Sequence, residues 1–220
     1  ILCYCIEKSE KKDAFLEITG TPTYSFTDLS GKRSFTCNNH NAFLNMMEGA
    51  LTGKTGFTGD AGYCYVGAVK QDDRTFVAAL LGCGWPNNKT YKWSDMKKLM
   101  EFAFSNYHYM DIAEPDVRLE TVCVKNGADP SFQLKPDMEL QAIMESRPVC
   151  VLKADWEKTE VIYDYPRSLN APVQKGEILG QAEYYLEGEC VDEIPVTAGK
   201  TVESRDFLWF FTFVWKRYRL

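Results

Sequence analysis

A glycine-rich stretch in the first half of the chain combines the residue types that hold an anionic group. Residues 51–64 read Leu-Thr-Gly-Lys-Thr-Gly-Phe-Thr-Gly-Asp-Ala-Gly-Tyr-Cys, and residues 63–69 have the pattern of a strand. Glycines allow another backbone to approach closely. Lys54 supplies a fixed cation, and the hydroxyl of Thr55 lies beside it in sequence. The stretch is therefore predicted to bind an anion, and the candidates differ in which anion it binds.

The first candidate is a phosphate-binding loop. That motif needs a glycine, four residues and then Gly-Lys-Ser/Thr, and it opens a helix whose N-terminus faces the phosphates. Here only three residues separate Gly49 from Gly53, and a glycine and a strand follow Thr55. This context argues against a nucleotide site.

The second candidate is the Lys-Thr-Gly element of penicillin-recognising serine enzymes. Residues 53–58 (Gly-Lys-Thr-Gly-Phe-Thr) and 61–64 (Ala-Gly-Tyr-Cys), followed by a strand of small and apolar residues, resemble the low-molecular-weight D-alanyl-D-alanine carboxypeptidases. The alternative is a hairpin with a solvated lysine. A hairpin explains the glycines but not the order of the residues around them.

The resemblance implies a role for four residues. Carboxypeptidation is acyl transfer, in which a serine attacks the peptide carbonyl, D-alanine leaves, and water releases the acyl-enzyme. Lys54 and Thr55 would bind the substrate carboxylate, and Gly56 would let the substrate backbone lie along the strand. The backbone N–H of Phe57 would contribute to the oxyanion hole. The resemblance implies no cofactor and no metal.

The nucleophile of the family comes from Ser-x-x-Lys and its helper from Ser-x-Asn, both before Lys-Thr-Gly. Residues 9–12 match the first motif but lie too close to Lys54 to leave room for the second, and residues 94–97 follow Lys54. Residues 168–170 match the second motif in the wrong half of the chain. We therefore expect the chain alone to be inactive. Lys54 would then be solvated or paired with a nearby acid such as Asp60.

The first half of the chain predicts a mixed domain, the C-terminal part of a penicillin-binding (β-lactamase-like) α/β domain. Residues 21–36 have the pattern of a hairpin, and residues 38–47 that of an Asn-capped short helix. A strand pair is expected over residues 63–69 and 75–81. Ser94 is expected to cap a helix with four apolar residues on one face, Met96, Leu99, Met100 and Ala103.

The second half predicts an all-β sandwich, because short strands alternate with turn residues. The clearest strands are residues 117–123, 149–152, 160–163 and 181–186. Residues 171–180 resemble the C-terminal β-domain of the same carboxypeptidases. The expected fold class is therefore α+β. Its expected divisions are a partial penicillin-binding domain in residues 1–110, a β-sandwich in 111–200 and a membrane-proximal tail in 201–220.

The tail is aromatic over residues 207–215 and basic immediately afterwards. A spanning helix needs roughly twenty apolar residues, so this run is too short to cross a bilayer. It fits an interfacial anchor, with aromatic rings at the headgroups and cations toward anionic lipid. A clipped transmembrane segment or a core strand is the alternative.

Composition excludes several classes of partner. The net charge of −6 argues against a nucleic-acid binder. Eight cysteines show no Cys-x-x-Cys pair and no zinc-site spacing, which makes metal binding improbable. Cys64, Cys123 and Cys150 alternate with strand residues and are expected to be small buried hydrophobes. The first residues show no initiator Met and no signal-peptide pattern, so we expect the chain to start inside something larger or after processing.

The resemblance therefore implies a D-alanyl-D-alanine carboxypeptidase of peptidoglycan maturation at the outer face of the cytoplasmic membrane. Its substrate would be a stem peptide ending in D-Ala-D-Ala, and β-lactams would bind if the serine half is present. The missing half would leave apolar surface exposed, so we expect a homo-oligomer or a companion N-terminal half to cover it. The alternative is a catalytically inactive fragment or an interaction module at the cell envelope.

Overall fold

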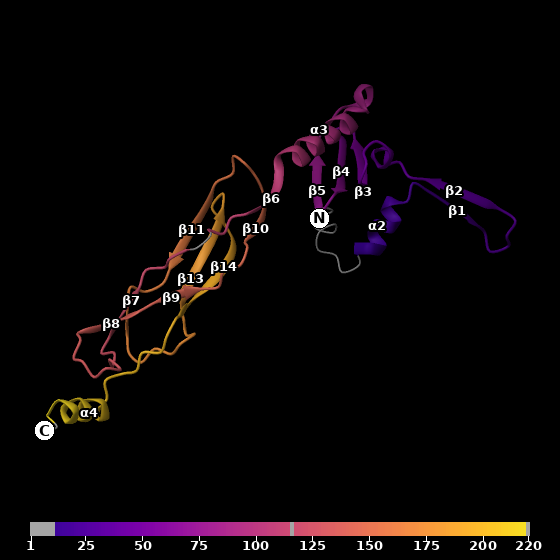
Figure 1. Cartoon of the computed structure of the whole chain (residues 1–220). Helices are drawn as coiled ribbons and strands as arrows, with labels where there is room; N and C mark the ends of the chain where they lie inside the picture. The colour runs from indigo at the N-terminus through magenta and orange to yellow at the C-terminus, as the bar shows by residue number, and fades with distance from the viewer. Residues whose placement is uncertain (1–11, 115–116, 219–220) are drawn as a thin grey trace. The chain divides into compact units, whose positions relative to one another are not determined.

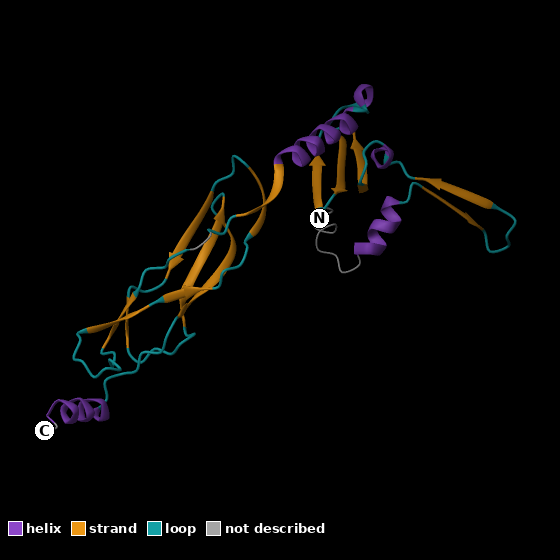
Figure 2. Ribbon diagram, in the orientation of Figure 1, coloured by secondary structure: helices purple, strands orange, loops and turns teal. Residues whose placement is uncertain are grey.

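A computed structural model describes residues 12–114 and 117–218 of the chain. The chain divides into two compact units, Ile1–Tyr107 and His108–Leu220 (Figure 1). Helices and sheets are both present, and the sheets dominate (Figure 2). The α+β class expected from the sequence is confirmed.

The first unit is built on a three-stranded antiparallel sheet in the order β3-β4-β5. Its strands are β3 (Ala50–Thr58), β4 (Gly62–Gln71) and β5 (Arg74–Leu80). Helix α3 (Tyr91–Asn106) packs against β4 and β5, whereas α2 (Lys12–Gly20) contacts β3 (Figure 2). The strand pair expected from the sequence is therefore present as β4 and β5.

Helix α3 buries a stripe of side chains with a spacing of four residues, namely Lys92, Met96, Met100 and Phe104. The sequence prediction for this helix was wrong about its N-terminal cap and about one residue of its buried face. The helix begins at Tyr91 after Thr90, so Ser94 lies inside the first turn, where its hydroxyl donates to the carbonyl of Tyr91. Leu99 is 44% exposed. The helical period carries it away from the stripe that Met96 and Met100 define.

A two-stranded hairpin precedes the sheet, with β1 (Thr23–Thr27) paired to β2 (Ser34–Asn38). The expected hairpin is thus present, and the rings of Phe26 and Phe35 stack across it at 5.2 Å. A 3₁₀ helix, η1 (Ala42–Asn45), follows. Asn41 precedes this helix but makes no capping hydrogen bond, contrary to the sequence prediction.

The second unit contains two main sheets, one in the order β11-β13-β14-β9 and one in the order β12-β7-β8. A shorter pair joins β10 to β6. The strands are β6 (Tyr107–Asp111), β7 (Val122–Lys125), β8 (Asp137–Leu140), β9 (Ala142–Met144), β10 (Cys150–Ala154), β11 (Thr159–Asp164), β12 (Ser168–Asn170), β13 (Ile178–Leu186) and β14 (Glu189–Ala198).

Both main sheets contribute to one apolar core, as the sandwich prediction requires. Val122 and Leu140 from the smaller sheet pack in the same cluster as Val196 from the larger sheet, and all three are fully buried. No helix lies between residues 117 and 197. The strand expected from residue 117 begins only at Val122, and residues 117–121 line a cavity.

The cysteine prediction was wrong. Cys64 and Cys123 are half-buried and Cys150 is exposed. Side chains alternate along a strand, so the burial of Val122 and Val124 in the core turns Cys123, which lies between them, toward the opposite face. None of the cysteines in the described ranges is fully buried. Cys3 and Cys5 lie outside those ranges.

An ion pair joins the turn after β9 to strand β14. Arg147 donates two hydrogen bonds to the carboxylate of Asp192, at 2.6 and 2.8 Å. These bonds hold the pKa of Asp192 below its ordinary value of 3.8. Such a group stabilises the fold above its ordinary pKa, and that contribution is lost as the pH falls through the lowered pKa.

We therefore expect Arg147→Gln to lower the melting temperature near neutral pH. The difference from the unmodified chain should shrink as the pH falls below 3.8, because Asp192 then becomes protonated in both proteins. Thermal unfolding followed by circular dichroism across this range measures the effect. Arg118→Gln, at an exposed arginine of the same unit, is the matched control. If Arg147→Gln lowers the melting temperature by the same amount at every pH, the proposed effect of the ion pair with Asp192 is contradicted.

Helix α4 (Phe207–Tyr218) ends the described chain, so the alternative of a core strand is wrong. Trp209 and Lys216 attach it to the β-unit. Trp209 is 8% exposed and donates from its ring nitrogen to the carbonyl of Asp129, and the ammonium of Lys216 lies 4.0 Å from the ring centre of Phe132. Phe132 stacks on the ring of Trp209 at 5.9 Å. Within residues 12–114 and 117–218, no helix is long and apolar enough to cross a membrane.

Candidate substrate-binding site

Strand β3 carries all four residues that the sequence assigned to the site. Lys54, Thr55, Gly56 and Phe57 are consecutive on this strand and pair with Val66, Tyr65, Cys64 and Tyr63 of β4. Strand β3 is terminal in its sheet, so within the described residues no strand pairs with its other edge. An extended peptide can add to such an edge through main-chain hydrogen bonds.

Lys54 is exposed, and its ammonium group donates to the carbonyl of Thr55. Within the described part of the chain it has no carboxylate partner, so the expected alternative pairing with Asp60 is not seen. The cation is therefore held next to the strand by a local hydrogen bond. An incoming anion can replace that single acceptor.

The two glycines of the motif differ in what surrounds them. A Cβ added at Gly53 would lie 2.7 Å from a ring carbon of Tyr65 and 2.8 Å from the amide nitrogen of Asn41. At Gly56 the nearest atom is the Cβ of Cys64, at 4.0 Å. Packing therefore requires a glycine at Gly53, whereas the protein itself leaves open space at Gly56. That open space is what a ligand backbone needs.

We expect Gly53→Ala to lower the free energy of unfolding by about 1–3 kcal/mol, the usual cost of overpacking a fixed site. Gly56→Ala should leave stability within about 1 kcal/mol of the unmodified chain, since only ordinary contacts surround the added methyl group. Urea unfolding of the two variants measures both values. Equal destabilisation would contradict the difference between the two positions.

A buried polar pair lies behind Gly53. Tyr65 is fully buried and donates from its hydroxyl to the side-chain oxygen of Asn41 at 2.9 Å. Burial raises the pKa of Tyr65 to about 12. The amide nitrogen of Asn41 has no hydrogen-bond partner among the described residues. The sequence predicted only an Asn-capped helix at residues 38–47, because nothing local reveals a partner of Asn41 that lies 24 residues away.

A cavity of about 220 Å³ adjoins the motif on the face of the sheet that α3 covers. It is lined by residues of the motif, of β4, of α3 and of the segment before η1, namely His40, Thr55, Gly56, Phe57, Tyr63, Lys92 and Trp93. Lys92 is only 6% exposed. Its burial is not evident from the sequence, because a lysine near the start of a helix normally lies in solvent.

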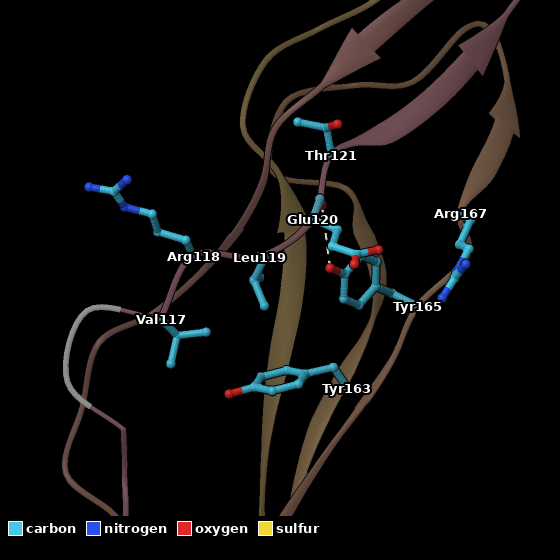
Figure 3. Close-up of a pocket in the computed structure, with 8 residues that line it drawn as sticks. All are labelled: Val117, Arg118, Leu119, Glu120, Thr121, Tyr163, Tyr165 and Arg167. Atoms are coloured by element: carbon cyan, nitrogen blue, oxygen red, sulfur yellow. Dashed lines mark hydrogen bonds between the residues drawn. The ribbon is translucent and has the colours of Figure 1, made fainter.

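The second unit holds a cavity of about 270 Å³ between residues 117–121 and strand β11 (Figure 3). The hydroxyl of Tyr165 donates to the carbonyl of Glu120 at 3.3 Å on one side. In Figure 3 the side chain of Arg118 points away from the two tyrosine rings. The lining residues in the described chain include no serine, cysteine, lysine or histidine. The lining carries the carboxylate of Glu120 and the hydroxyl of Thr121, and it includes none of the residues of the Lys-Thr-Gly motif.

No group of three histidine, cysteine, aspartate or glutamate side chains within the described ranges could hold a metal ion. The residues that the site does bring together are a cation, hydroxyl groups, aromatic rings and backbone donors. This set suits the binding of a carboxylate and an extended peptide.

Residues 107–204 match the family profile described as penicillin-binding protein 5, C-terminal domain. The chain is 26% identical over 206 residues to the D-alanyl-D-alanine carboxypeptidase DacF of Bacillus subtilis, a match that covers 91% of this chain and 49% of that protein. It is 25% identical over 154 residues to the D-alanyl-D-alanine carboxypeptidase DacC of Escherichia coli, covering 70% of this chain and 36% of that protein.

A crystal structure of the D-alanyl-D-alanine carboxypeptidase DacD from Francisella tularensis is also similar, with a TM-score of 0.47 and 25% identity. That match covers 79% of this chain and 41% of the other. The chain thus spans about half the length, or less, of the relatives that it matches. Residues 107–204 are thus similar to the C-terminal domain of penicillin-binding protein 5, and the chain as a whole is similar to a C-terminal part of the D-alanyl-D-alanine carboxypeptidases.

Proposed function

We propose that this chain is the substrate-binding part of a serine-type D-alanyl-D-alanine carboxypeptidase that acts on peptidoglycan stem peptides. The observation that carries the proposal is strand β3, an edge strand that presents Lys54, Thr55 and Phe57 around the open space at Gly56. The two relatives that are named D-alanyl-D-alanine carboxypeptidases support the same reading.

The proposed binding mode follows from the geometry of the edge. A stem peptide would pair with the backbone of β3, and Gly56 would let it approach without a side-chain clash. The Lys54 ammonium and the Thr55 hydroxyl would hold the terminal carboxylate by charge-assisted hydrogen bonds. The N–H of Phe57 would donate to the oxyanion that forms when the serine attacks the carbonyl.

The nucleophilic serine and its lysine would come from a segment that carries Ser-x-x-Lys and Ser-x-Asn. Residues 9–11 of the literal match lie outside the described residues, so the structure does not place Ser9. In the proposed enzyme a β-lactam would occupy the same edge and acylate that serine. The proposal also places the enzyme outside the cytoplasm, where peptidoglycan is matured.

Labelling with a fluorescent penicillin tests the proposal, because only a complete serine site forms a lasting acyl adduct. We expect no adduct with the 220-residue chain. We expect a stable adduct when the chain is joined to an upstream segment with both motifs. An extended protein that folds but takes up no label would contradict the proposed activity and favour a non-catalytic module at the cell envelope.

Helix α4 is proposed to bind the membrane surface. Its exposed side chains are mostly apolar or aromatic, and they are Phe207, Leu208, Phe210, Phe211, Val214, Trp215 and Tyr218. Lys216 and Arg217 lie in its last turn. The ammonium of Lys216 lies over the ring of Phe132, 4.0 Å from its centre, so Arg217 is the cation proposed to face anionic headgroups. Trp209 holds the helix to the β-unit through Asp129 and Phe132, and the exposed apolar side chains remain available to a lipid surface.

A further inference from the structure

Lys92 is a buried lysine without an acidic partner within the described ranges. It is 6% exposed, and its ammonium group donates to the carbonyl of Lys89 at 2.5 Å. The same group lies 4.3 Å from the ring centre of Tyr63 and 4.6 Å from that of Trp93. The ammonium therefore has two aromatic faces and one carbonyl around it, and no carboxylate.

The nearest acid on the same helix is already engaged. Asp95 accepts a hydrogen bond from the thiol of Cys83 at 3.1 Å and forms an ion pair with Lys98 at 3.7 Å. Burial lowers the pKa of Lys92, as expected for an ammonium group removed from water without a counter-ion. An anion that reached this ammonium would offset its desolvation cost. The arrangement thus favours the binding of a negatively charged group.

The cavity that contains Lys92 opens beside the proposed substrate strand. Thr55, Gly56 and Phe57 of β3 form one wall, and Lys92 and Trp93 of α3 form another. A peptide paired with an edge strand places alternate side chains on the two faces of the sheet. One of these faces is the face that α3 covers (Figure 2). A side chain of the bound peptide can therefore enter this cavity.

On the basis of the proposed function, we propose that Lys92 is a second anion-binding residue of the site and that it binds a carboxylate carried by a side chain of the peptide on β3. Lys54 would bind the terminal carboxylate, and Lys92 would make the site selective for peptides with an acidic side chain. The rings of Tyr63 and Trp93 would pack against the apolar part of that side chain and exclude water.

Two isosteric probes test this selectivity, N-acetyl-L-glutamyl-D-alanyl-D-alanine and N-acetyl-L-glutaminyl-D-alanyl-D-alanine. Affinity for the full chain is measured from NMR chemical-shift changes on titration. We expect the glutamyl probe to bind about tenfold tighter, the usual gain from a hydrogen bond to a charged group. Lys92→Met should abolish this preference and Lys92→Arg should retain part of it. Lys97→Met, at an exposed lysine of the same helix, should leave it unchanged.

The outcomes separate this inference from the proposed function. Equal affinity for the two probes would overturn the role of Lys92 and leave the carboxypeptide site on β3 intact. A preference that survives in folded Lys92→Met would overturn it as well, and circular dichroism checks that the variant folds. N-acetyl-L-glutamate amide, which lacks the D-alanyl-D-alanine end, is the third probe. If it binds Lys92 as tightly as the full glutamyl probe, Lys92 binds anions but the proposed use of β3 fails. Failure of all three probes to bind would overturn both.

Discussion

Lys54→Ala is expected to slow acylation by penicillin about 100-fold in the polypeptide that also carries the upstream serine motif. Loss of one positioned donor to a developing or bound anion typically costs this much. The exposed position of Lys54 and its single carbonyl acceptor indicate that the side chain contributes little to folding. The effect should therefore appear in the acylation rate and not in the melting temperature.

Two further variants serve as controls for the effect of Lys54→Ala on the acylation rate. Lys54→Arg keeps the charge and should lose less activity than Lys54→Ala. Lys97→Ala removes an exposed lysine that pairs with Glu101 on α3 and should acylate at the unmodified rate. Stopped-flow or gel-based labelling at several penicillin concentrations gives the rates. A Lys54→Ala protein that acylates normally would contradict the assignment of the carboxylate to Lys54.

The combined substitution Phe211→Asp and Val214→Asp is expected to weaken binding to anionic phospholipid vesicles by about 100-fold or more. Both side chains are about half exposed, at 55% and 50%, and lie apart from the contacts of Trp209 with the β-unit. Full burial of an apolar side chain of this size contributes about 1.5–3 kcal/mol, and two such losses account for the expected change.

The control for this prediction adds the same negative charge elsewhere. Thr159→Asp combined with Gln174→Glu places two charges on exposed parts of the β-unit and should reduce vesicle binding much less. Co-sedimentation with vesicles of phosphatidylglycerol and phosphatidylcholine measures the partitioning. Equal loss in both double variants would show that net charge, and not helix α4, determines the association.

The sequence was sufficient to predict the parts of the fold that local patterns determine. The patterns of residues 63–69 and 75–81 predicted the strand pair that the structure shows as β4 and β5. The turn residues at Glu187 and Gly188 both have positive φ, at 49° and 84°, and they join β13 to β14 in the tight hairpin that such residues favour. These features depend on a few neighbouring residues.

Features that depend on distant contacts could not be predicted in the same way. The hydrogen bond between Tyr65 and Asn41 needs the sheet and the segment before η1 to be assembled. The burial of Lys92 depends on where α3 begins. The sequence analysis placed the N-terminal cap at Ser94, whereas the residue before the helix is Thr90. Cys150 looked like a core residue, yet the strand that it begins pairs only with β6 in a two-stranded sheet.

The central claim is that β3 binds a peptide ending in D-Ala-D-Ala, and NMR titration of the ¹⁵N-labelled 220-residue chain tests it most directly. The ligand is N-acetyl-L-glutaminyl-D-alanyl-D-alanine, whose neutral side chain makes the test independent of Lys92, and the same peptide with two L-alanines is the control. We predict that the D,D-peptide shifts the backbone amides of Lys54, Thr55, Gly56 and Phe57 and that the L,L-peptide shifts them much less. Shifts confined to the cavity at Tyr163 and Tyr165, or equal shifts of β3 with both peptides, would contradict the account.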